Sequence, residues 1–328
     1  MTVARRWTVR LLGMLVVIAG AGVGYLYAAY PAAIPAEDLR IEATPGTLAR
    51  GRYLFDHVAG CADCHSTRDW TKYGGPVTPG TVGKGGDLFG TAMGLPGNFY
   101  ARNITPAGVG DWTDGELVRA ITTGIDRHGE PLFPIMPYPV FGQMAREDIE
   151  AIVAYMRTLP AIPNPVPAHT YEFPMQLVVR TMPKPAAFVT RPDPGDRVRH
   201  GAYLARGCGD CHTPAVQGTP VAGMAFAGGM EFPLPGGGYV RTANLTPDAA
   251  TGLGTWTEQQ FVDKFKTMAE APDLVLATPA DARKNTVMPW KLLGGMTRED
   301  LGAIYAYLRS LPPVVHRVEK YGDAPLTP

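Results

Sequence analysis

The sequence has little net charge, little strand-like alternation and, after its first thirty residues, no long apolar run. It contains 30 basic and 30 acidic side chains, and charged residues make up only 18% of its 328 residues. No basic field indicates a nucleic-acid partner, and no acidic tail indicates a solvating segment. Because alternation is scarce while helical periodicity recurs, we expect an all-α protein with long loops. Its length gives room for two ordinary domains.

The one long apolar run lies near the N-terminus. Residues 11–30 carry no charge, three arginines precede them and two acidic residues follow. Twenty helical residues at about 1.5 Å each cover roughly 30 Å, the thickness of a bilayer core, and exceed the apolar part of a cleaved signal peptide. The flanking charges predict a cytoplasmic N-terminus and an exported body. We favour an uncleaved single-pass anchor over residues 1–33 and keep a removed signal peptide as the alternative.

After this run the sequence repeats itself. The closest match joins residues 136–160 to residues 288–312, where Met-Pro, Arg-Glu-Asp, Ala-Ile, Ala-Tyr and Leu-Pro recur in register. Such self-similarity indicates duplicated structural units. We expect two homologous domains, joined by a Pro-rich linker that wraps or spaces them. Their predicted limits are 45–160 for unit 1, 161–195 for the linker, 196–315 for unit 2 and 316–328 for a C-terminal tail.

Helical periodicity closes each unit. Apolar residues recur three and four positions apart over 149–159 and 301–308, which predicts amphipathic helices that end before Pro160 and Pro312. Helix starts are indicated by threonines with a suitable partner three positions later, as in a capping box or its close variant. These pairs are Thr113 with Glu116, Thr257 with Gln260, and Thr297 with Asp300.

The only four cysteines form two C-x-x-C-H motifs. A zinc ribbon is disfavoured because 143 residues lie between the pairs, and a thioredoxin-type site because the βαβ context is missing. A disulfide between such close neighbours would constrain little and would not explain the histidines. The motifs are Cys61, Cys64 and His65 in unit 1, and Cys208, Cys211 and His212 in unit 2.

C-x-x-C-H is the attachment motif of c-type haem. Two thiols add across the two vinyl groups of the porphyrin, so their spacing must match the ring, and the next residue brings an imidazole nitrogen under the iron. Two copies in register, using every cysteine, predict two covalently bound haem c groups. In each unit the two cysteines would attach the cofactor, and His65 or His212 would bind the iron.

The sixth iron ligand has two candidates in each unit. Met136 and Met288 match across the repeat in M-P-[YW], 71 and 76 residues after their histidines, and both lie in loops. Met144 and Met296 also match, but they lie at the start of the final helix, where packing explains them. We predict Met136 and Met288 as ligands, because His/Met ligation fills the coordination sphere and suits electron transfer. His128 is a rival in unit 1.

Four other matched residues have weaker claims. Trp112 and Trp256 could donate an indole N–H to a haem propionate, although a core role is nearly as well supported. Asn103 and Asn244 could orient propionates, but we prefer that they cap turns.

The order of these motifs resembles a known family. C-x-x-C-H, N-I-T-P, W-T-D-G-E and M-P-Y-P-V-F-G, followed by the helix with R-E-D-I-E-A-I-V-A-Y-M, is similar to the cytochrome c subunits of periplasmic alcohol, gluconate, aldehyde and fructose dehydrogenases. The resemblance covers both units. It implies tandem class I cytochrome c domains and electron transfer from a partner dehydrogenase, through a membrane quinone or oxidase, into the respiratory chain. Those subunits typically carry three haems, whereas this chain has two motifs.

The resulting hypothesis is a non-enzymatic electron carrier on the periplasmic side of the inner membrane. The alternative is a di-haem cytochrome c peroxidase or another haem enzyme, which would need an iron with an open position and acid–base help. A matched methionine in both loops disfavours it. A thiosulfate-oxidising di-haem cytochrome would need an unusual ligand such as a further cysteine, and none remains.

Overall fold

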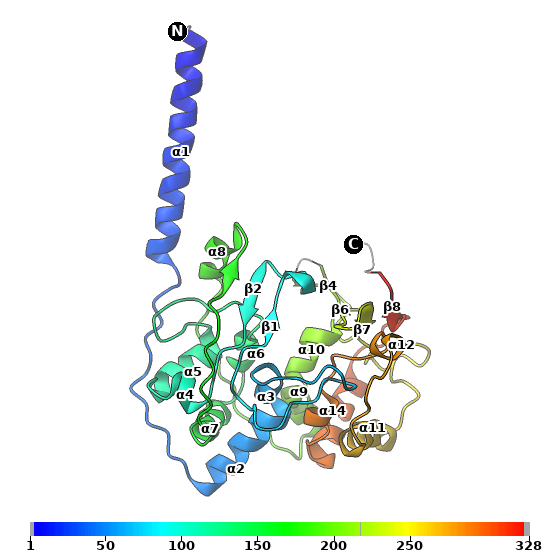
Figure 1. The fold of residues 1–328 in the computed structure, drawn as a ribbon. Coiled ribbons are helices and arrows are strands. Elements are labelled where there is room, and N and C mark those ends of the chain that lie inside the picture. The colour runs from blue at the N-terminus through cyan, green and yellow to red at the C-terminus, as the bar shows by residue number, and fades with distance from the viewer. Residues whose placement is uncertain (1–2, 217, 325–328) are drawn as a thin grey trace.

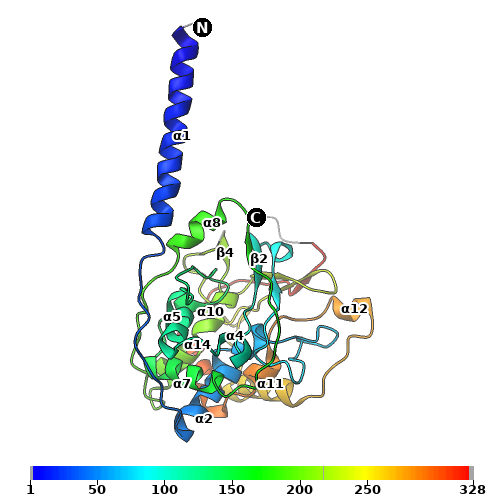
Figure 2. The same cartoon turned by 60° about the vertical axis from the view of Figure 1, so that its left-hand side comes forward.

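A computed structural model describes residues 3–216 and 218–324 of the chain. Residues 1–2 of the predicted anchor and 325–328 of the predicted tail therefore lie outside the described residues. Helix α1 (Val3–Ala29) stands away from the folded body as a straight rod, as Figures 1 and 2 show. Within the described residues, it is the one helix that is long and apolar enough to cross a membrane, and its apolar side chains are exposed.

Unit 1 consists of short helices, with a long and mostly irregular segment between α3 and α5. Its final helix α7 begins at Arg146 and ends at Met156, close to the predicted limits. The capping box of α5 is present, with Thr113 and Glu116 exchanging hydrogen bonds as predicted. In chain order the elements are α2 (Pro45–Tyr53), η1 (Leu54–Val58), α3 (Cys61–Cys64), β1 (Leu88–Phe89), η2 (Thr91–Met93), β2 (Gly97–Tyr100), α4 (Pro106–Val109), α5 (Asp114–Thr123), α6 (Tyr138–Phe141) and α7.

Unit 2 repeats the main helices and the strand pair in the same order, with β4, β5 and α12 added and with no equivalents of η1, η2 and α4 among its described residues. The predicted final helix is α14 (Arg298–Ser310), and α11 carries the predicted capping box of Thr257 and Gln260. The linker contributes β3 (Thr170–Tyr171), α8 (Met175–Val178) and η3 (Val179–Thr181). The other elements are α9 (Arg197–Leu204), α10 (Arg206–His212), β4 (Ala215–Val216), β5 (Thr219–Pro220), β6 (Glu231–Pro233), β7 (Tyr239–Arg241), α11 (Glu258–Glu270), α12 (Pro279–Ala282), α13 (Trp290–Leu293) and β8 (Tyr321–Gly322).

Helices dominate the fold, but three small sheets mean that it is not strictly all-α. The antiparallel sheet β1–β2–β3 belongs to unit 1, β6–β7–β8 occupies the matching place in unit 2, and β4 pairs with β5. In both three-stranded sheets the last strand comes from the segment after the unit. These strands are two to four residues long, too short for an alternating pattern to be visible in the sequence.

In each unit the first and last helices cross closely, α2 on α7 and α9 on α14. Glycines make the contact possible: a Cβ on Gly51 would lie 1.9 Å from Ala151 O, and a Cβ on Gly201 would lie 1.9 Å from Ala303 O. No side chain fits at such distances, so the backbones touch only because glycine stands at both matched positions. Buried apolar residues of both units join one core cluster.

The linker wraps unit 1 rather than spacing the units. Asn164 donates its amide N–H to Lys84 O at 3.0 Å, and β3 pairs with β2. Farther along, the N–H of Ala187 donates to Gly142 O at 2.8 Å, and Arg191 forms an ion pair with Asp148 at 3.1 Å. The prolines therefore support an extended path across the surface.

A reciprocal pair of hydrogen bonds joins the two units. Tyr203 of unit 2 donates its hydroxyl to Asp148 of unit 1 at 2.7 Å, and Tyr53 of unit 1 donates to Asp300 of unit 2 at 2.5 Å. Tyr53 matches Tyr203 in the repeat, and Asp148 matches Asp300. Burial alone would raise the pKa of Asp148, but hydrogen bonds from Arg50 and Tyr203 outweigh it and hold the pKa below its ordinary value.

Candidate functional sites

The two C-x-x-C-H motifs begin on short helices at matching places. In unit 2, α10 carries Cys208, Cys211 and His212 directly after α9. Unit 1 has three more residues between its tyrosine and its first cysteine, and the π-helix η1 accommodates them before α3. Gly60, with a left-handed φ of 63°, then turns the chain into α3.

Both motif histidines are oriented by a backbone carbonyl. The Nδ1 atom of His65 lies 2.7 Å from Arg102 O, and that of His212 lies 2.8 Å from Ala243 O. A carbonyl oxygen can only accept, so each Nδ1 carries the proton and each Nε2 keeps a free lone pair. Burial lowers the pKa of both histidines, which favours the neutral imidazole. An oriented neutral imidazole with a free Nε2 fits a residue that would bind a haem iron.

One glycine in each unit permits the contact between the motif histidine and its carbonyl, and the sequence motifs did not point to either glycine. Gly85 N donates to His65 O at 2.9 Å, and Gly228 N donates to His212 O at 2.7 Å. Both glycines have left-handed φ angles, 70° and 74°, and a Cβ on either would lie about 2.5 Å from the backbone of the segment that supplies the carbonyl. A Gly-Gly pair that recurs in register, 85–86 and 228–229, is the sequence signal that could have identified them.

No disulfide joins any of the four cysteines, which is compatible with their use in haem attachment. Burial raises the pKa of Cys61 and Cys208 to about 12, and it raises the pKa of Cys64 as well. No cluster of three or more His, Cys, Asp or Glu in the described part of the chain could hold a metal ion by itself.

The two pairs of matched methionines differ in burial. Met144 and Met296 are only 4% and 2% exposed and belong to the shared core. Met136 and Met288 are half-buried, each in the turn before a short helix, and each carbonyl accepts the N–H two residues later, at 2.7 and 2.9 Å. Packing accounts for Met144 and Met296, which supports Met136 and Met288 as the ligands; that assignment stays a prediction. His128 lies exposed on a turn built around Asp126.

The loop that carries Met288 is held by unit 1. Gly74 N donates to the buried Asn285 Oδ1 at 2.8 Å, and Asn285 Nδ2 donates to Lys72 O at 3.4 Å. Asn285 Oδ1 also accepts the N–H of Thr286, whose hydroxyl accepts the N–H of Met288 at 3.1 Å. A chain of hydrogen bonds therefore leads from unit 1 to the backbone of Met288.

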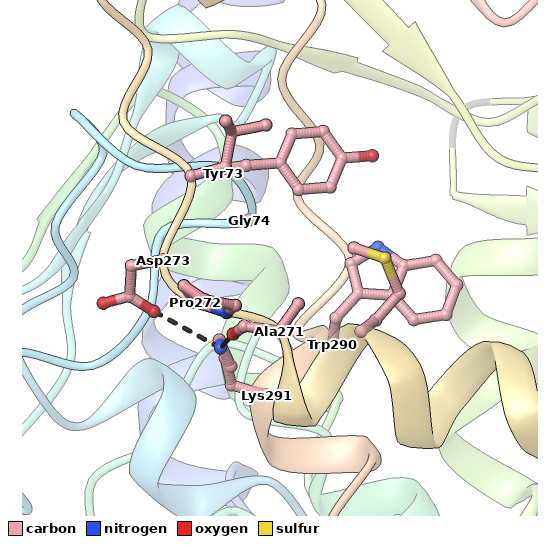
Figure 3. A pocket seen from close by; sticks show the side chains of 9 residues that line it. Tyr73, Gly74, Ala271, Pro272, Asp273, Trp290 and Lys291 are labelled. Atoms are coloured by element: carbon pink, nitrogen blue, oxygen red, sulfur yellow. Dashed lines mark hydrogen bonds and ion pairs between the residues drawn. The ribbon is translucent and has the colours of Figure 1, made fainter.

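A cavity of about 320 Å³ opens beside this contact. Tyr73 and Gly74 of unit 1 form one part of its wall, and Trp290 and Lys291 of unit 2 form another (Figure 3). Lys291 Nζ lies 3.4 Å from Asp273 and also donates to Ala271 O (Figure 3). The cavity therefore marks the seam between the two units, directly after Met288.

The four residues with weaker claims to a haem contact, two asparagines and two tryptophans, differ in their surroundings. Asn103 and Asn244 both cap turns, because each Oδ1 accepts the N–H and the hydroxyl of the threonine two residues later. Trp112 is 6% exposed, as a core tryptophan would be, whereas Trp256 is 37% exposed. The matched tryptophans therefore do not share one environment.

Two histidines whose role the sequence did not reveal lie between the units or close to their contact. His57 Nδ1 is 2.8 Å from Leu292 O of unit 2, and His200 Nε2 is 2.7 Å from Asp300. His57 lies on η1, the segment that accommodates the three extra residues of unit 1. That length difference between the repeats is the signal that could have pointed to it.

Comparisons with known proteins show the same duplication of the domain. The family model for cytochrome c matches residues 48–160 and again residues 199–312. The cytochrome c subunit of the quinone-dependent alcohol dehydrogenase of Gluconacetobacter polyoxogenes is 30% identical over 304 residues, which cover 87% of this chain and 60% of that protein. The fructose dehydrogenase cytochrome subunit of Gluconobacter japonicus is 29% identical over 295 residues, covering 85% and 55%.

A third relative is closer in length to this chain. A "diheme cytochrome c-type" protein of Cereibacter sphaeroides is 27% identical over 282 residues, which cover 82% of this chain and 87% of that protein. The chain thus spans only 55 to 60% of the length of the two dehydrogenase subunits.

Proposed function

Because this chain belongs to the cytochrome c family, with two copies of the family's domain, we propose that it is a membrane-anchored electron carrier with two covalent haem c groups. The observation that carries the proposal is the matched pair of histidines, each next to two free cysteines and each turned by a carbonyl so that Nε2 is free. We propose units 45–160 and 196–315 as the two haem domains.

In unit 1, Cys61 and Cys64 would attach the haem, with His65 and Met136 as iron ligands. In unit 2, Cys208 and Cys211 would attach it, with His212 and Met288 as ligands. When bound, the haem iron supplies reversible one-electron chemistry whose potential is raised by a thioether ligand. The chain itself fixes the tautomer of each histidine through Arg102 O or Ala243 O, which raises the basicity of Nε2.

The proposed donor is a periplasmic dehydrogenase, and the proposed acceptor is a membrane quinone or an oxidase of the respiratory chain. The similarity to cytochrome subunits of alcohol and fructose dehydrogenases supports the donor. Helix α1 supports a single-pass anchor in the inner membrane, with both units on the periplasmic side. An anchor keeps the carrier near membrane partners and so raises its local concentration.

A methionine in the same loop of each unit supports a carrier over a di-haem peroxidase, which would need one open iron. The test is to produce the full chain in cells that attach c-type haem. We expect a red protein that keeps its colour after acid–acetone extraction, gains the mass of two haems and reacts only slowly with hydrogen peroxide when reduced. An unmodified chain rules out the haem proposal, and rapid peroxide turnover rules out the carrier.

A further inference from the structure

An apolar segment of the linker projects from the body next to the base of α1. We call residues 173–178 the apolar tip; its sequence is F-P-M-Q-L-V. Phe173 is 78% exposed, and Pro174 and Val178 are exposed as well. Large apolar side chains gathered at one protrusion are unusual on a soluble surface and indicate an interaction site.

The tip lies at the level where α1 leaves its apolar span. Figures 1 and 2 both show α8, the helix of the tip, beside the last turns of α1, and the two helices are in contact. Arg180, just after the tip, donates Nε–H to Tyr30 O at 2.8 Å and lies 4.6 Å from the centre of the Tyr27 ring. These contacts fix the tip against the end of the helix that would emerge from the bilayer.

The other end of the tip is fixed to unit 1. Strand β3 directly precedes it and pairs with β2, and Glu172 N donates to Pro96 O at 3.0 Å. Arg180 also pairs with Glu130 at 3.0 Å. The tip is therefore a braced corner of unit 1, and its height relative to α1 is set by the fold.

We propose that the apolar tip inserts into the lipid interface of the membrane that α1 spans, as a second contact of the body with the bilayer. The inference rests on the proposed anchor. If the apolar run from residue 11 to residue 30 fills the bilayer core, Tyr25, Tyr27 and Tyr30 lie at its outer boundary, where aromatic side chains gather. A segment in contact with that end of α1 lies at the same depth.

Lipid is the occupant that this position favours. The tip presents Phe, Pro and Val without a charged side chain, and such groups gain free energy at the boundary between headgroups and acyl chains. One helix alone leaves the tilt of α1, and of the body fixed to it, unconstrained relative to the bilayer. A second contact sets the tilt of unit 1, and with it the face that both units present to a membrane partner.

The test uses single cysteines in the full-length haem protein in lipid nanodiscs. All four native thiols are consumed if the haems are attached, so an introduced cysteine is the only site for a spin label. Wild-type protein treated with the same reagent is the control and should take up no label. The variants are Phe173→Cys and Val178→Cys in the tip, Val16→Cys in α1, and Arg52→Cys on α2, at the end of the body far from α1 in Figures 1 and 2. Collision with oxygen, which partitions into lipid, is compared with collision with a water-soluble nickel chelate.

We expect the label at Val16 to collide mainly with oxygen, the label at Arg52 mainly with nickel, and both tip labels to lie between the two. Tip labels that behave like Arg52, while Val16 is lipid-exposed, overturn the proposal and leave the anchor intact. A Val16 label that is accessible to nickel overturns the anchor itself. Tip labels shielded from both reagents mean that protein covers the tip, which also overturns the proposal.

Discussion

The two units share the arrangement of their motif histidines but differ in how the loop before the methionine is held. In unit 1 the residue three before Met136 is Phe133, whose ring stacks on Phe99 of the same unit at 4.1 Å. In unit 2 the matching residue is Asn285, which bonds to Lys72 and Gly74 of unit 1. Unit 1 therefore supports its own loop, whereas unit 2 depends on its neighbour.

This difference shows where a duplicated domain is free to change. The histidine and its carbonyl are kept in both copies, because ligand geometry tolerates little change. The interval between histidine and methionine is five residues longer in unit 2. Part of that interval forms backbone hydrogen bonds with unit 1, from Tyr73 N to Leu274 O and from Leu276 N to Thr71 O, both at 2.8 Å. The changed loop has become the seam that joins the units.

The largest effects are expected from removing the proposed methionine ligand of each unit. Met136→Ala should open one iron and Met288→Ala the other, because each removes a thioether that no neighbouring core methionine replaces. Each variant should lose half of the weak long-wavelength charge-transfer absorption of the oxidised protein and bind carbon monoxide at one reduced haem. Absorption spectra and carbon monoxide titration measure this.

Met144→Ala and Met296→Ala are the matched controls. They should leave both irons closed while costing about 2–5 kcal/mol of stability, the usual range for a buried methionine. If Met144→Ala opens an iron and Met136→Ala does not, the assignment in unit 1 is wrong. If neither does, His128 becomes the candidate.

The next largest effect concerns the reciprocal hydrogen bonds. Tyr203→Phe and Tyr53→Phe each remove a hydroxyl bonded to a carboxylate of the other unit, and such bonds contribute about 1.5–3 kcal/mol. We expect both variants to lower the free energy of unfolding in urea. Because Asp148 keeps two arginines while Asp300 keeps only His200, the loss of Tyr53 should cost more. Equal costs would show that the arginines do not compensate.

A smaller and more local effect is expected from Asn285→Ala. It removes the acceptor for Gly74 N and Thr286 N, and an unsatisfied buried donor costs about 1–3 kcal/mol. The charge-transfer absorption and the potential of haem 2 alone should shift, because the backbone of Met288 loses its support. Phe133→Leu is the matched control and should affect haem 1 alone. If Asn285→Ala changes neither spectrum nor potential while Met288→Ala opens the iron, the bonds from unit 1 do not position the ligand.

The sequence predicted local features better than contacts between the units. The final helices, the caps at Thr113 and Thr257 and the two motifs depend on residues close together in the chain, so their patterns are visible. The helix start at Thr297 is confirmed as well, because its hydroxyl accepts the N–H of Asp300 and α14 begins at the next residue. The carboxylate of Asp300 binds His200 and Tyr53, so this cap is the one-way variant of a capping box. Contacts between the repeats produce no periodic pattern in the sequence. The short strands produce no detectable alternation either.

The smallest predicted effect compares the capping boxes of the two long helices α5 and α11. In α5, Thr113 N donates to Glu116 at 2.8 Å, and in α11, Thr257 N donates to Gln260 at 2.9 Å. Thr113→Ala and Thr257→Ala should each destabilise the first turn by about 1 kcal/mol. The consequences should differ, because α5 buries seven residues and α11 only two.

Opening α5 exposes core, so the loss of its cap should lower the global stability in urea. Helix α11 can fray at its first turn while the core stays closed, so Thr257→Ala should speed hydrogen exchange of the α11 amides and barely move the urea midpoint. Hydrogen exchange followed by mass spectrometry, alongside urea unfolding of both variants, measures the two effects. Equal shifts of the urea midpoint would mean that α11 opens only with the whole protein, and that the second unit is as cooperative as the first.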